Sequence, residues 1–469
     1  MKKKLNKIYA IALIASFSYL TYSCSNEVLS EEAIANEKVT VQSKSSQNSS
    51  YMVIFQDEAI PSGFENASKG VGTIKKSINE IGVVVMESND ANFIKKVTKI
   101  AGVRSAVPDL DVQWIEPQNF TPEASPASIG DDEPFFSLMW GLDAIDAPEA
   151  WNAGYTGESV RVAVLDSGID AEHPDLSPNL NTDLSASFIA GEDWNIQPGF
   201  YFNHGTHVSG TIAAADNSFG VIGVAPNVEL VTVKVLSEFT GSGPFSSINA
   251  GIVYAADIGA DVINMSLGAS LNKNGKIPQS DGSIIKIPGK FIAEIKIAMQ
   301  RAIDYAYRNG VTIVTSAGND AVNADGNASE VILPADLNNV ITVSATAPDY
   351  WAANQNTDLD VPASYTNYGR SLIDVSAPGG DFDFFPLDLW HYDMVLSTIS
   401  NGWSWSAGTS MASPHVAGVA ALIIGKNGGD MHPHEVGKQL MNTADKIDGN
   451  GKSLFHGKGR INAYRAVTE

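Results

Sequence analysis

Several kinds of residue are scarce in this 469-residue chain, and each scarcity excludes a class of protein. Cys24 is the only cysteine, so the chain can form no internal disulfide and no metal cage built from thiolates. Basic residues are few: 30 Lys and Arg stand against 53 Asp and Glu, which gives a net charge of −23. A chain this acidic repels phosphate backbones, so we expect no nucleic-acid partner. The 44% of hydrophobic residues still suffices for a large core, which excludes wholesale disorder.

The hydrophobic run at the start of the chain, from Ile8 to Leu20, is also short. It lacks the roughly 20 residues that a membrane-spanning helix needs. A cluster of lysines precedes it, which is typical of a signal peptide, so we interpret residues 1–24 as an export signal. Cys24, just after this run, resembles the acylated cysteine of a bacterial lipoprotein lipobox. The alternatives are a lipoprotein of the cell envelope and an extracellular protein with an incidental cysteine.

The next part of the chain divides into a tether, a small module and a linker. Residues 25–50 are rich in Ser, Glu, Asn and Gln without a periodic apolar face, and they predict a flexible tether. Residues 51–116 predict a small ferredoxin-like α+β module, with a β-α-β unit followed by a second, similar one. Its expected strands are 51–55, 83–86, 103–107 and 112–115, and its expected helices are 74–81 and 93–100. Residues 117–132 are rich in Pro, Ser and acid and predict a linker.

Residues 133–469 follow a different pattern, in which short, unbroken apolar segments alternate with helical ones. Unbroken apolar strands are buried on both faces, so the pattern predicts an α/β fold with a doubly wound, mostly parallel sheet and helices on both faces. Ligands bind such sheets beyond the carboxyl ends of the strands. The expected strands are 160–165, 228–236, 262–265, 311–314 and 340–343, and the expected helices are 246–258, 291–308 and 411–424.

Polar residues occur at the ends of these elements. Asp166 closes the first strand, where a buried acid needs a partner. His204 opens the string His-Gly-Thr-His-Val-Ser-Gly ahead of a small-residue helix. Ser410 lies in Gly-Thr-Ser-Met-Ala-Ser-Pro-His, at a helix N-terminus where backbone N–H groups favour negative charge. Asn319 follows the strand 311–314. Each residue alone has an ordinary structural explanation, but together they supply an acid, a base, a nucleophile and an amide donor.

Two histidines three residues apart, His204 and His207, also raise the alternative of a metal-dependent hydrolase. No third ligand is evident in the same motif, which makes a poor zinc site. We therefore expect no catalytic metal.

The three motifs together resemble the signatures of the subtilisin-like serine proteases, or subtilases, over residues 133–469. The resemblance implies a subtilisin-like fold and a serine endopeptidase that cleaves polypeptides through an acyl-enzyme. It implies Asp166, His204 and Ser410 as a catalytic triad and Asn319 as an oxyanion donor. The residues that it implies for substrate binding are Ser266, Leu267, Gly268, Ala317 and Gly318.

The resemblance extends to a calcium site and to the preceding module. Asp175 and Asn217 are similar to ligands of the family's structural calcium, although the family's N-terminal glutamine ligand has no counterpart and Phe136 falls near its position. The end of the module, residues 101–109, looks like the end of a subtilase inhibitory propeptide, which would make the chain a zymogen processed within the linker. The alternatives are a stably attached accessory domain and, for the whole chain, a catalytically silent surface binding protein.

Overall fold

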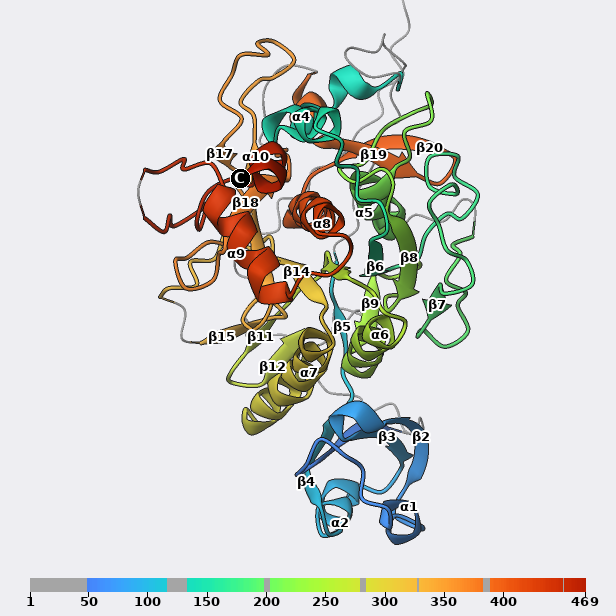
Figure 1. Cartoon of the computed structure of the whole chain (residues 1–469). Helices are drawn as coiled ribbons and strands as arrows, with labels where there is room; N and C mark the ends of the chain where they lie inside the picture. The colour runs from blue at the N-terminus through green and yellow to red at the C-terminus, as the bar shows by residue number, and fades with distance from the viewer. Residues whose placement is uncertain are drawn as a thin grey trace, which may run out of the picture. The chain divides into compact units, whose positions relative to one another are not determined.

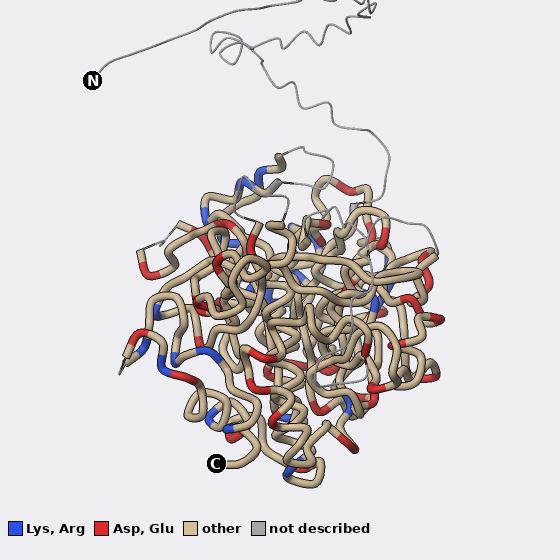
Figure 2. The backbone as a smooth tube through the Cα atoms, turned by 90° about the horizontal axis from the view of Figure 1, so that it is seen from above, with Lys and Arg blue, Asp and Glu red and all other residues tan. Residues whose placement is uncertain are grey.

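The structure is a computed structural model that describes residues 49–115, 133–197, 203–278, 284–326, 329–382, 389–449 and 451–469. The predicted signal, Cys24 and nearly all of the tether and linker lie outside these residues. Among the described residues, no helix combines the length and apolarity that a membrane span requires. Asp and Glu positions are spread around the chain rather than gathered on one side (Figure 2).

Residues 49–115, which we call the N-terminal module, begin with a four-stranded antiparallel sheet in the order β2-β3-β1-β4 (Figure 1). One face of this sheet packs against two short helices, since Val53 and Phe55 of β1 share a core with Phe64 and Phe93. The alternate residues, among them Met52, point into a second core beyond the module. The elements are β1 (Ser49–Phe55), α1 (Phe64–Ala67), β2 (Thr73–Ile78), η2 (Asn79–Ile81), β3 (Val83–Ser88), α2 (Phe93–Val97) and β4 (Val103–Pro108).

Three expectations for this module were wrong. The segment 74–81 is not one helix: residues up to Ile78 belong to β2, which pairs along β3, and only Asn79–Ile81 form a single helical turn, η2. The first helix is instead α1. Residues 112–115 do not join the sheet, because β5 (Asp111–Gln113) pairs with β9 (Ser242–Pro244) far along the chain. The tether also ends earlier than residue 50, since β1 begins at Ser49.

The larger part of the chain is built on a mostly parallel sheet in the order β17-β16-β14-β10-β6-β8-β7, with β18 beside β16. Its strands fall within a few residues of the predicted segments, and β14 and β16 are buried throughout. The predicted fold class is therefore confirmed. The strands are β6 (Arg161–Asp166), β7 (Ala186–Ser187), β8 (Glu229–Lys234), β10 (Val262–Met265), β14 (Thr312–Ser316), β16 (Ile341–Ala347), β17 (Val361–Pro362) and β18 (Val375–Pro378).

Helices cover both faces of this sheet (Figure 1). Val162 and Val164 of β6 belong to the core under α5 and α8, whereas Ala163 and Leu165 belong to the core under α6 and α7. The first face carries α3 (Trp140–Ala144), α4 (Ala147–Asn152), α5 (His204–Ala213), α8 (Thr409–Lys426), α9 (Pro433–Thr443) and α10 (Ala463–Thr468). The second face carries α6 (Phe245–Asp257) and α7 (Lys290–Arg308).

Short antiparallel pairs lie outside the main sheet: β11 (Ala269–Asn272) with β15 (Glu330–Leu333), β12 (Lys276–Pro278) with β13 (Ile284–Lys286), and β19 (Val395–Ile399) with β20 (Gly402–Ser406). Two single-turn helices complete the described elements, η3 (Phe136–Leu138) and η4 (Trp390–Asp393). The first of these strand pairs follows Gly268 directly, so it extends one wall of the candidate site described next.

Candidate active site

An acid and a base meet at the carboxyl end of the central strand β6. Asp166 ends this strand and is fully buried, and His204 is the first residue of α5. The Nδ1 atom of His204 lies 2.9 Å from both carboxylate oxygens of Asp166. The backbone N–H of Ser167 donates to Asp166 Oδ1 at 2.6 Å. The buried carboxylate is thus compensated, and it fixes the orientation of the imidazole ring.

The close approach of α5 to β6 depends on a glycine. A Cβ atom at Gly205 would lie 2.2 Å from the carbonyl oxygen of Gly168 and 3.2 Å from Asp166 Cβ. Any other residue would push the start of α5, and His204 with it, away from the acid. The glycine after His204 is therefore a geometric requirement of the Asp166–His204 contact.

Ser410 is the second residue of α8, so it lies in the first turn of a long helix. Its Oγ donates to the carbonyl oxygen of Ser266 at 3.2 Å, and Ser266 Oγ donates back to the Ser410 carbonyl at 2.7 Å. Asn264 Nδ2 donates to Ser266 Oγ and its Oδ1 accepts from Ser413 Oγ, so a buried chain of hydrogen bonds ties the helix start to β10. Sequence reasoning missed Asn264 and Ser413, whose roles depend on partners about 150 residues away.

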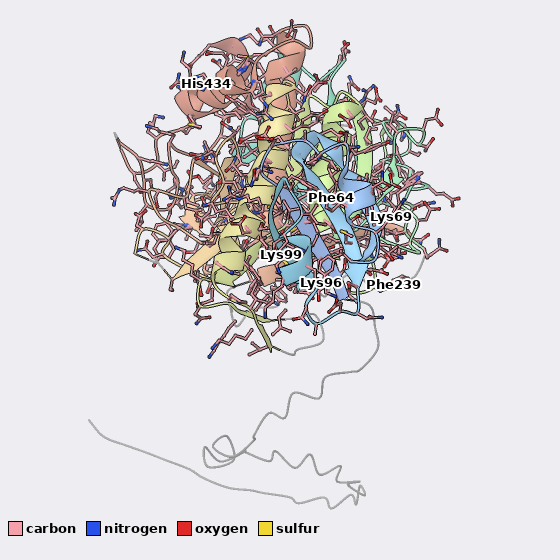
Figure 3. All side chains as sticks on the ribbon, turned by 90° about the horizontal axis from the view of Figure 1, so that it is seen from below. Phe64, Lys69, Lys96, Lys99, Phe239 and His434 are labelled. Atoms are coloured by element: carbon pink, nitrogen blue, oxygen red, sulfur yellow. The ribbon has the colours of Figure 1, made fainter. Side chains whose placement is uncertain are left out.

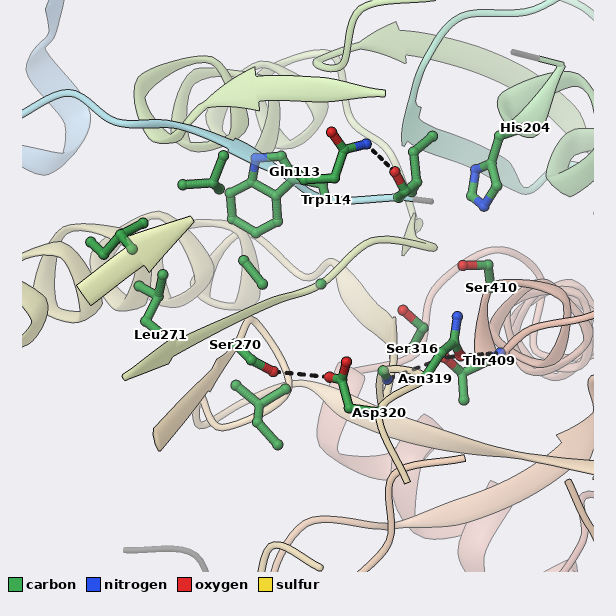
Figure 4. Close-up of a pocket in the computed structure, with 17 residues that line it drawn as sticks. Gln113, Trp114, His204, Ser270, Leu271, Ser316, Asn319, Asp320, Thr409 and Ser410 are labelled. Carbon is green, nitrogen blue, oxygen red and sulfur yellow. Dashed lines mark hydrogen bonds between the residues drawn. The ribbon is translucent and has the colours of Figure 1, made fainter. Parts of the chain in front are cut away.

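Asn319 presents an amide N–H₂ group beside Ser410. Its Oδ1 accepts from the backbone N–H and the hydroxyl of Thr409, at 3.0 and 2.7 Å. With the oxygen held there, the amide nitrogen is directed toward the Ser410 side of the cavity (Figure 4). The preceding Gly318 has φ +96° and a Cβ there would lie 2.4 Å from Asn367 Nδ2, so this turn also requires glycine.

His204, Ser410 and Asn319 line one cavity of about 260 Å³ (Figure 4). Asp166 is not among the lining residues and lies behind His204. Of the five residues expected to bind substrate, Gly268 and Gly318 line the cavity, whereas Ser266, Leu267 and Ala317 are buried behind it. Asp320, which follows Asn319 and which the sequence suggested could favour basic or polar side chains, also lines the cavity. The other lining residues are Val112, Gln113, Trp114, Ile115, Ala269, Ser270, Leu271, Ile277, Ser316, Ile332 and Thr409.

Part of the N-terminal module lies in this cavity as an added strand. β5 runs antiparallel to β9, and on its other side the Gly268 N–H donates to the Trp114 carbonyl at 3.1 Å. The Trp114 side chain is buried: its Nε1 donates to the Gly243 carbonyl at 2.7 Å, and its ring meets the Phe245 ring edge-on at 4.8 Å. An extended peptide between two sheet edges is a recurring mode of peptide recognition.

The module also docks on α6 and α7, away from the cavity (Figure 3). Arg301 of α7 donates to the carbonyl oxygens of Phe55, Ile81 and Gln56 at 3.1 to 3.3 Å. Ser246, near the start of α6, donates through its N–H and hydroxyl to the Asp109 carboxylate. Burial raises the pKa of Asp109, and the bonds from Ser246 oppose that shift.

His207 has surroundings unlike those of His204. It is fully buried, and its Nε2 lies 3.2 Å from the Val395 carbonyl and 3.1 Å from the Ser404 carbonyl of the β19–β20 pair. Burial, and then the charge of His204, lower the pKa of His207 to about 3, so it stays neutral at physiological pH. Within the described ranges, no three His, Cys, Asp or Glu side chains are grouped to hold a metal. His207 therefore ties α5 to the β19–β20 pair.

Asp175 and Asn217, the residues expected at a calcium site, do lie near each other. Asp175 is fully buried, its Oδ1 lies 3.5 Å from Asn217 Nδ2, and its Oδ2 accepts from the Val221 N–H and the Trp403 indole. Burial raises the pKa of Asp175. Glu133 is also fully buried, and its Oε1 accepts from the N–H groups of Asn217 and Ser218. The carboxylates of Asp175 and Glu133 thus both accept hydrogen bonds from residues 217–221. The sequence suggested only Asp175.

Comparisons with known proteins agree with this geometry. The model of the subtilase family matches residues 157–459. The chain is 37% identical over 332 residues to subtilisin DY of Bacillus licheniformis. The aligned region covers 71% of this chain and 99% of that protein. It is 34% identical to subtilisin E of Bacillus subtilis, over 93% of this chain and 94% of the relative. It is 30% identical to a thermophilic serine proteinase of a Bacillus species, over 99% of this chain and all of that protein.

Solved structures resemble the fold. Fervidolysin from Fervidobacterium pennivorans, a keratinolytic enzyme related to subtilisin, matches with a TM-score of 0.68 and 25% identity, over 90% of this chain and 61% of that one. The epidermin leader peptide processing serine protease of Staphylococcus aureus matches with a TM-score of 0.70 over 90% of this chain and 98% of that one. Its sequence identity is 23%, so this likeness supports the fold alone.

Proposed function

Because the chain belongs to the subtilase family, we propose that it is an exported serine endopeptidase, made as a zymogen and acting through Asp166, His204 and Ser410. The observation that carries the proposal is that a hydrogen-bonded acid–base pair, a serine at a helix N-terminus and an outward amide converge on one peptide-binding cavity. The relatives named as subtilisins and serine proteinases support the same chemistry.

In the proposed mechanism, Ser410 Oγ attacks the carbonyl carbon of the scissile peptide bond. His204 accepts the hydroxyl proton and returns it to the leaving amine, so an acyl-enzyme forms on Ser410. Asp166 holds the imidazole through Nδ1 and stabilises the imidazolium. Water then attacks the acyl carbonyl carbon while His204 accepts one of its protons, and the intermediate expels Ser410 Oγ, which takes that proton back from His204. The acyl group leaves as a carboxylic acid, which ionises. In the structure the Ser410 hydroxyl donates to the Ser266 carbonyl, so it turns toward His204 when substrate binds.

The negative charge that develops on the carbonyl oxygen needs donors that are already in place. The amide N–H₂ of Asn319 supplies one donor, because the hydrogen bonds from Thr409 hold the amide oxygen and leave the nitrogen facing the cavity. The backbone N–H of Ser410, in the first turn of α8, supplies another. Both belong to rigid parts of the protein, so little reorganisation accompanies the reaction.

Substrates would bind as extended peptides between β9 and the segment 266–268, where β5 lies. That a segment of the chain occupies these edges supports the N-terminal module as a propeptide that blocks the site. After a cut within the linker 117–132, the module would stay bound until it dissociates or is degraded. If Cys24 carries lipid, the anchor then belongs to the module, and the peptidase is released from the membrane.

Calcium is proposed as a structural ligand held by Asp175 and Asn217. Two buried carboxylates beside one loop suit a hard cation that prefers oxygen ligands, and Glu133 adds an acidic group where the sequence offered no glutamine. The ion would offset the buried charge and stabilise residues 217–221. A melting temperature that falls by several degrees in EDTA and recovers with calcium supports the site. An unchanged melting temperature contradicts it.

The experiment that tests the proposed activity is labelling with a serine-directed fluorophosphonate. We expect wild type to be labelled and to cleave a protein substrate, Ser410→Ala to do neither, and Ser177→Ala, at an exposed serine outside the cavity, to match wild type. A folded wild-type protein that is neither labelled nor active would favour the catalytically silent binding protein. Activity abolished by chelators but insensitive to fluorophosphonate would favour the metal-dependent hydrolase.

A further inference from the structure

A buried lysine next to the acid–base pair has no role in the chemistry described above. Lys234 is the last residue of β8 and pairs in register with Asp166, the last residue of β6. Its side chain is fully buried. A buried ammonium group is costly unless it meets opposite charge and hydrogen-bond acceptors, so its partners show what it holds in place.

Three groups surround the Lys234 ammonium. Its Nζ donates to the carbonyl oxygen of Ser167 at 2.6 Å and lies 3.2 Å from Glu192 Oε2 and 3.9 Å from Glu238 Oε1. The ammonium thus has a carbonyl acceptor and two carboxylates around it, of which Glu238 at 3.9 Å contributes through charge rather than a hydrogen bond. Burial lowers the pKa of Lys234, and the charges of Glu238 and Glu192 oppose that shift.

Toward the catalytic centre, the ammonium holds the residue that joins the acid to the base. Ser167 donates its N–H to Asp166 Oδ1, and its Oγ accepts from the N–H of Gly205, which follows His204. The Ser167 carbonyl, on the next peptide unit, is the group that Lys234 fixes. Movement of Ser167 would change the Asp166 carboxylate and the start of α5 together.

Toward the substrate, the same ammonium anchors the loop that leads to β9. The Glu238 N–H donates to Glu192 Oε2, and Glu238 Oε2 accepts from the Gln197 N–H, so two loops are locked onto Lys234. From Glu238 the chain runs through Thr240, whose carbonyl accepts from Gln113, to the strand that pairs with β5. One buried ion cluster is therefore linked through Ser167 to the acid–base pair and, through the chain from Glu238 to β9, to the edge that would bind peptide.

We propose that Lys234 is a positioning residue: with Glu192 and Glu238 it sets the register between the β9 edge, where substrate pairs, and the Asp166–His204 pair. The inference rests on the proposed function. Small displacements of reacting groups lower turnover strongly, so a cluster that spans both parts has a direct effect on the rate.

The test replaces the charge at either end of the cluster in the full chain. Lys234→Met keeps the aliphatic stem and removes the ammonium, Lys234→Arg keeps the charge, and Glu238→Gln removes one carboxylate. Lys296→Met, at a half-buried lysine of α7 whose Nζ donates to the Asp336 carbonyl outside the catalytic cavity, is the control. Steady-state kinetics on a peptide substrate are corrected for the active fraction by fluorophosphonate titration, and kcat/KM is measured from pH 5 to 10.

We expect Lys234→Met to lower kcat roughly 10- to 100-fold and Lys234→Arg to restore most of it. The groups around His204, namely Asp166 on β6, His207 on α5 and Ser410 on α8, stay the same in every variant. Because Lys234→Met removes a buried positive charge next to the acid–base pair, the acidic limb of its kcat/KM profile should move to higher pH. In Glu238→Gln it should move the opposite way.

A structural role alone would lower the melting temperature without opposite shifts of the pH profile. If Lys234→Met does not fold, Glu238→Gln still tests the inference, because the inference requires the acidic limb of its kcat/KM profile to move to lower pH. Wild-type kcat and profiles in the folded variants, or shifts in one direction for both, would overturn the inference. An inactive wild type beside an equally inactive Ser410→Ala would instead overturn the proposed function.

Discussion

The proposed catalytic centre and the N-terminal module are held in place by contacts of different kinds. Asp166, His204 and Ser410 are buried, and their neighbours are fixed by buried hydrogen bonds and by the Lys234 cluster. The module is attached in part through ion pairs at the surface, such as Arg308–Glu58 at 2.8 Å and Arg104–Glu294 at 3.0 Å. In the first of these pairs both side chains are more than two-fifths exposed.

This difference accords with the two roles that we propose. A catalytic centre needs donors and acceptors fixed to within a fraction of an ångström, and buried, fully bonded polar groups provide that rigidity. A propeptide must bind firmly during folding and then leave, and exposed ion pairs contribute little to affinity. The exceptions on the module are its buried anchor Trp114, the half-buried Asp109 and the Arg301 contacts. The predictions below test this division.

The largest effect is expected from Asn319→Ala in the rigid centre. Its amide would act only on the developing oxyanion, so kcat should fall about 10²- to 10³-fold with KM nearly unchanged; this magnitude is the one found for the equivalent loss in a subtilisin. Steady-state kinetics on a peptide substrate measure it. Asp320→Asn, the next residue, is a control for local disturbance of the turn. A rise in KM with wild-type kcat would assign Asn319 to ground-state binding.

The second effect concerns the buried anchor of the module. Truncation of a buried tryptophan to alanine costs roughly 3–5 kcal/mol in a protein core. Trp114→Ala should therefore release the cleaved module at least about 100-fold faster, seen as a shorter delay between processing and full activity. Gln113→Ala, at the half-exposed neighbour, should change the delay little. An unchanged delay in Trp114→Ala would show that the strand in the cavity contributes little to retention.

The contacts that the sequence could predict are local ones. The strings around His204 and Ser410 place both residues at helix starts because glycines and small residues are adjacent in the chain, and the structure has helices beginning there. The parallel strands could be predicted because burial on both faces requires unbroken apolar runs. Segment 74–81 was misassigned because Ile74, Ile78 and Ile81 fit the spacing of a helix, whereas pairing with β3 decides the conformation.

What the sequence could not predict depends on partners distant in the chain. The orientation of Asn319 is set by Thr409, 90 residues later, and the role of Lys234 by Ser167, 67 residues earlier. Glu133 accepts from the N–H of Asn217, 84 residues later. Trp114 was placed in a strand of the module, but its partners belong to β9 and Gly268. No local pattern encodes these contacts, because each depends on how the sheet brings its strand ends together.

The third prediction is a pH dependence of module release. Burial raises the pKa of Asp109 in the bound module, so binding favours its protonated form. The contribution to affinity is complete below the ordinary aspartate pKa of about 4 and is lost as pH rises through the raised value. Release should therefore be faster at pH 7 than at pH 4.5, where part of the protonated form's contribution to affinity is still present. Asp109→Asn should flatten this dependence; an equal slope in wild type and variant would refute it.

The smallest effect is expected from an exposed ion pair of the module. Arg308→Ala removes the contact with Glu58, and such pairs are worth about 0–1 kcal/mol, so release should accelerate by no more than about fivefold. Arg301→Ala on the same helix leaves the carbonyls of Phe55, Ile81 and Gln56 without their guanidinium donor, at a cost of about 1–3 kcal/mol. The two variants remove the same charge 7 residues apart on α7, so long-range electrostatics is nearly matched. If release rates at 0.15 M salt change equally in both variants, attachment is governed by net charge. If Arg301→Ala has the larger effect, attachment is governed by the part-buried hydrogen bonds to the module's carbonyls.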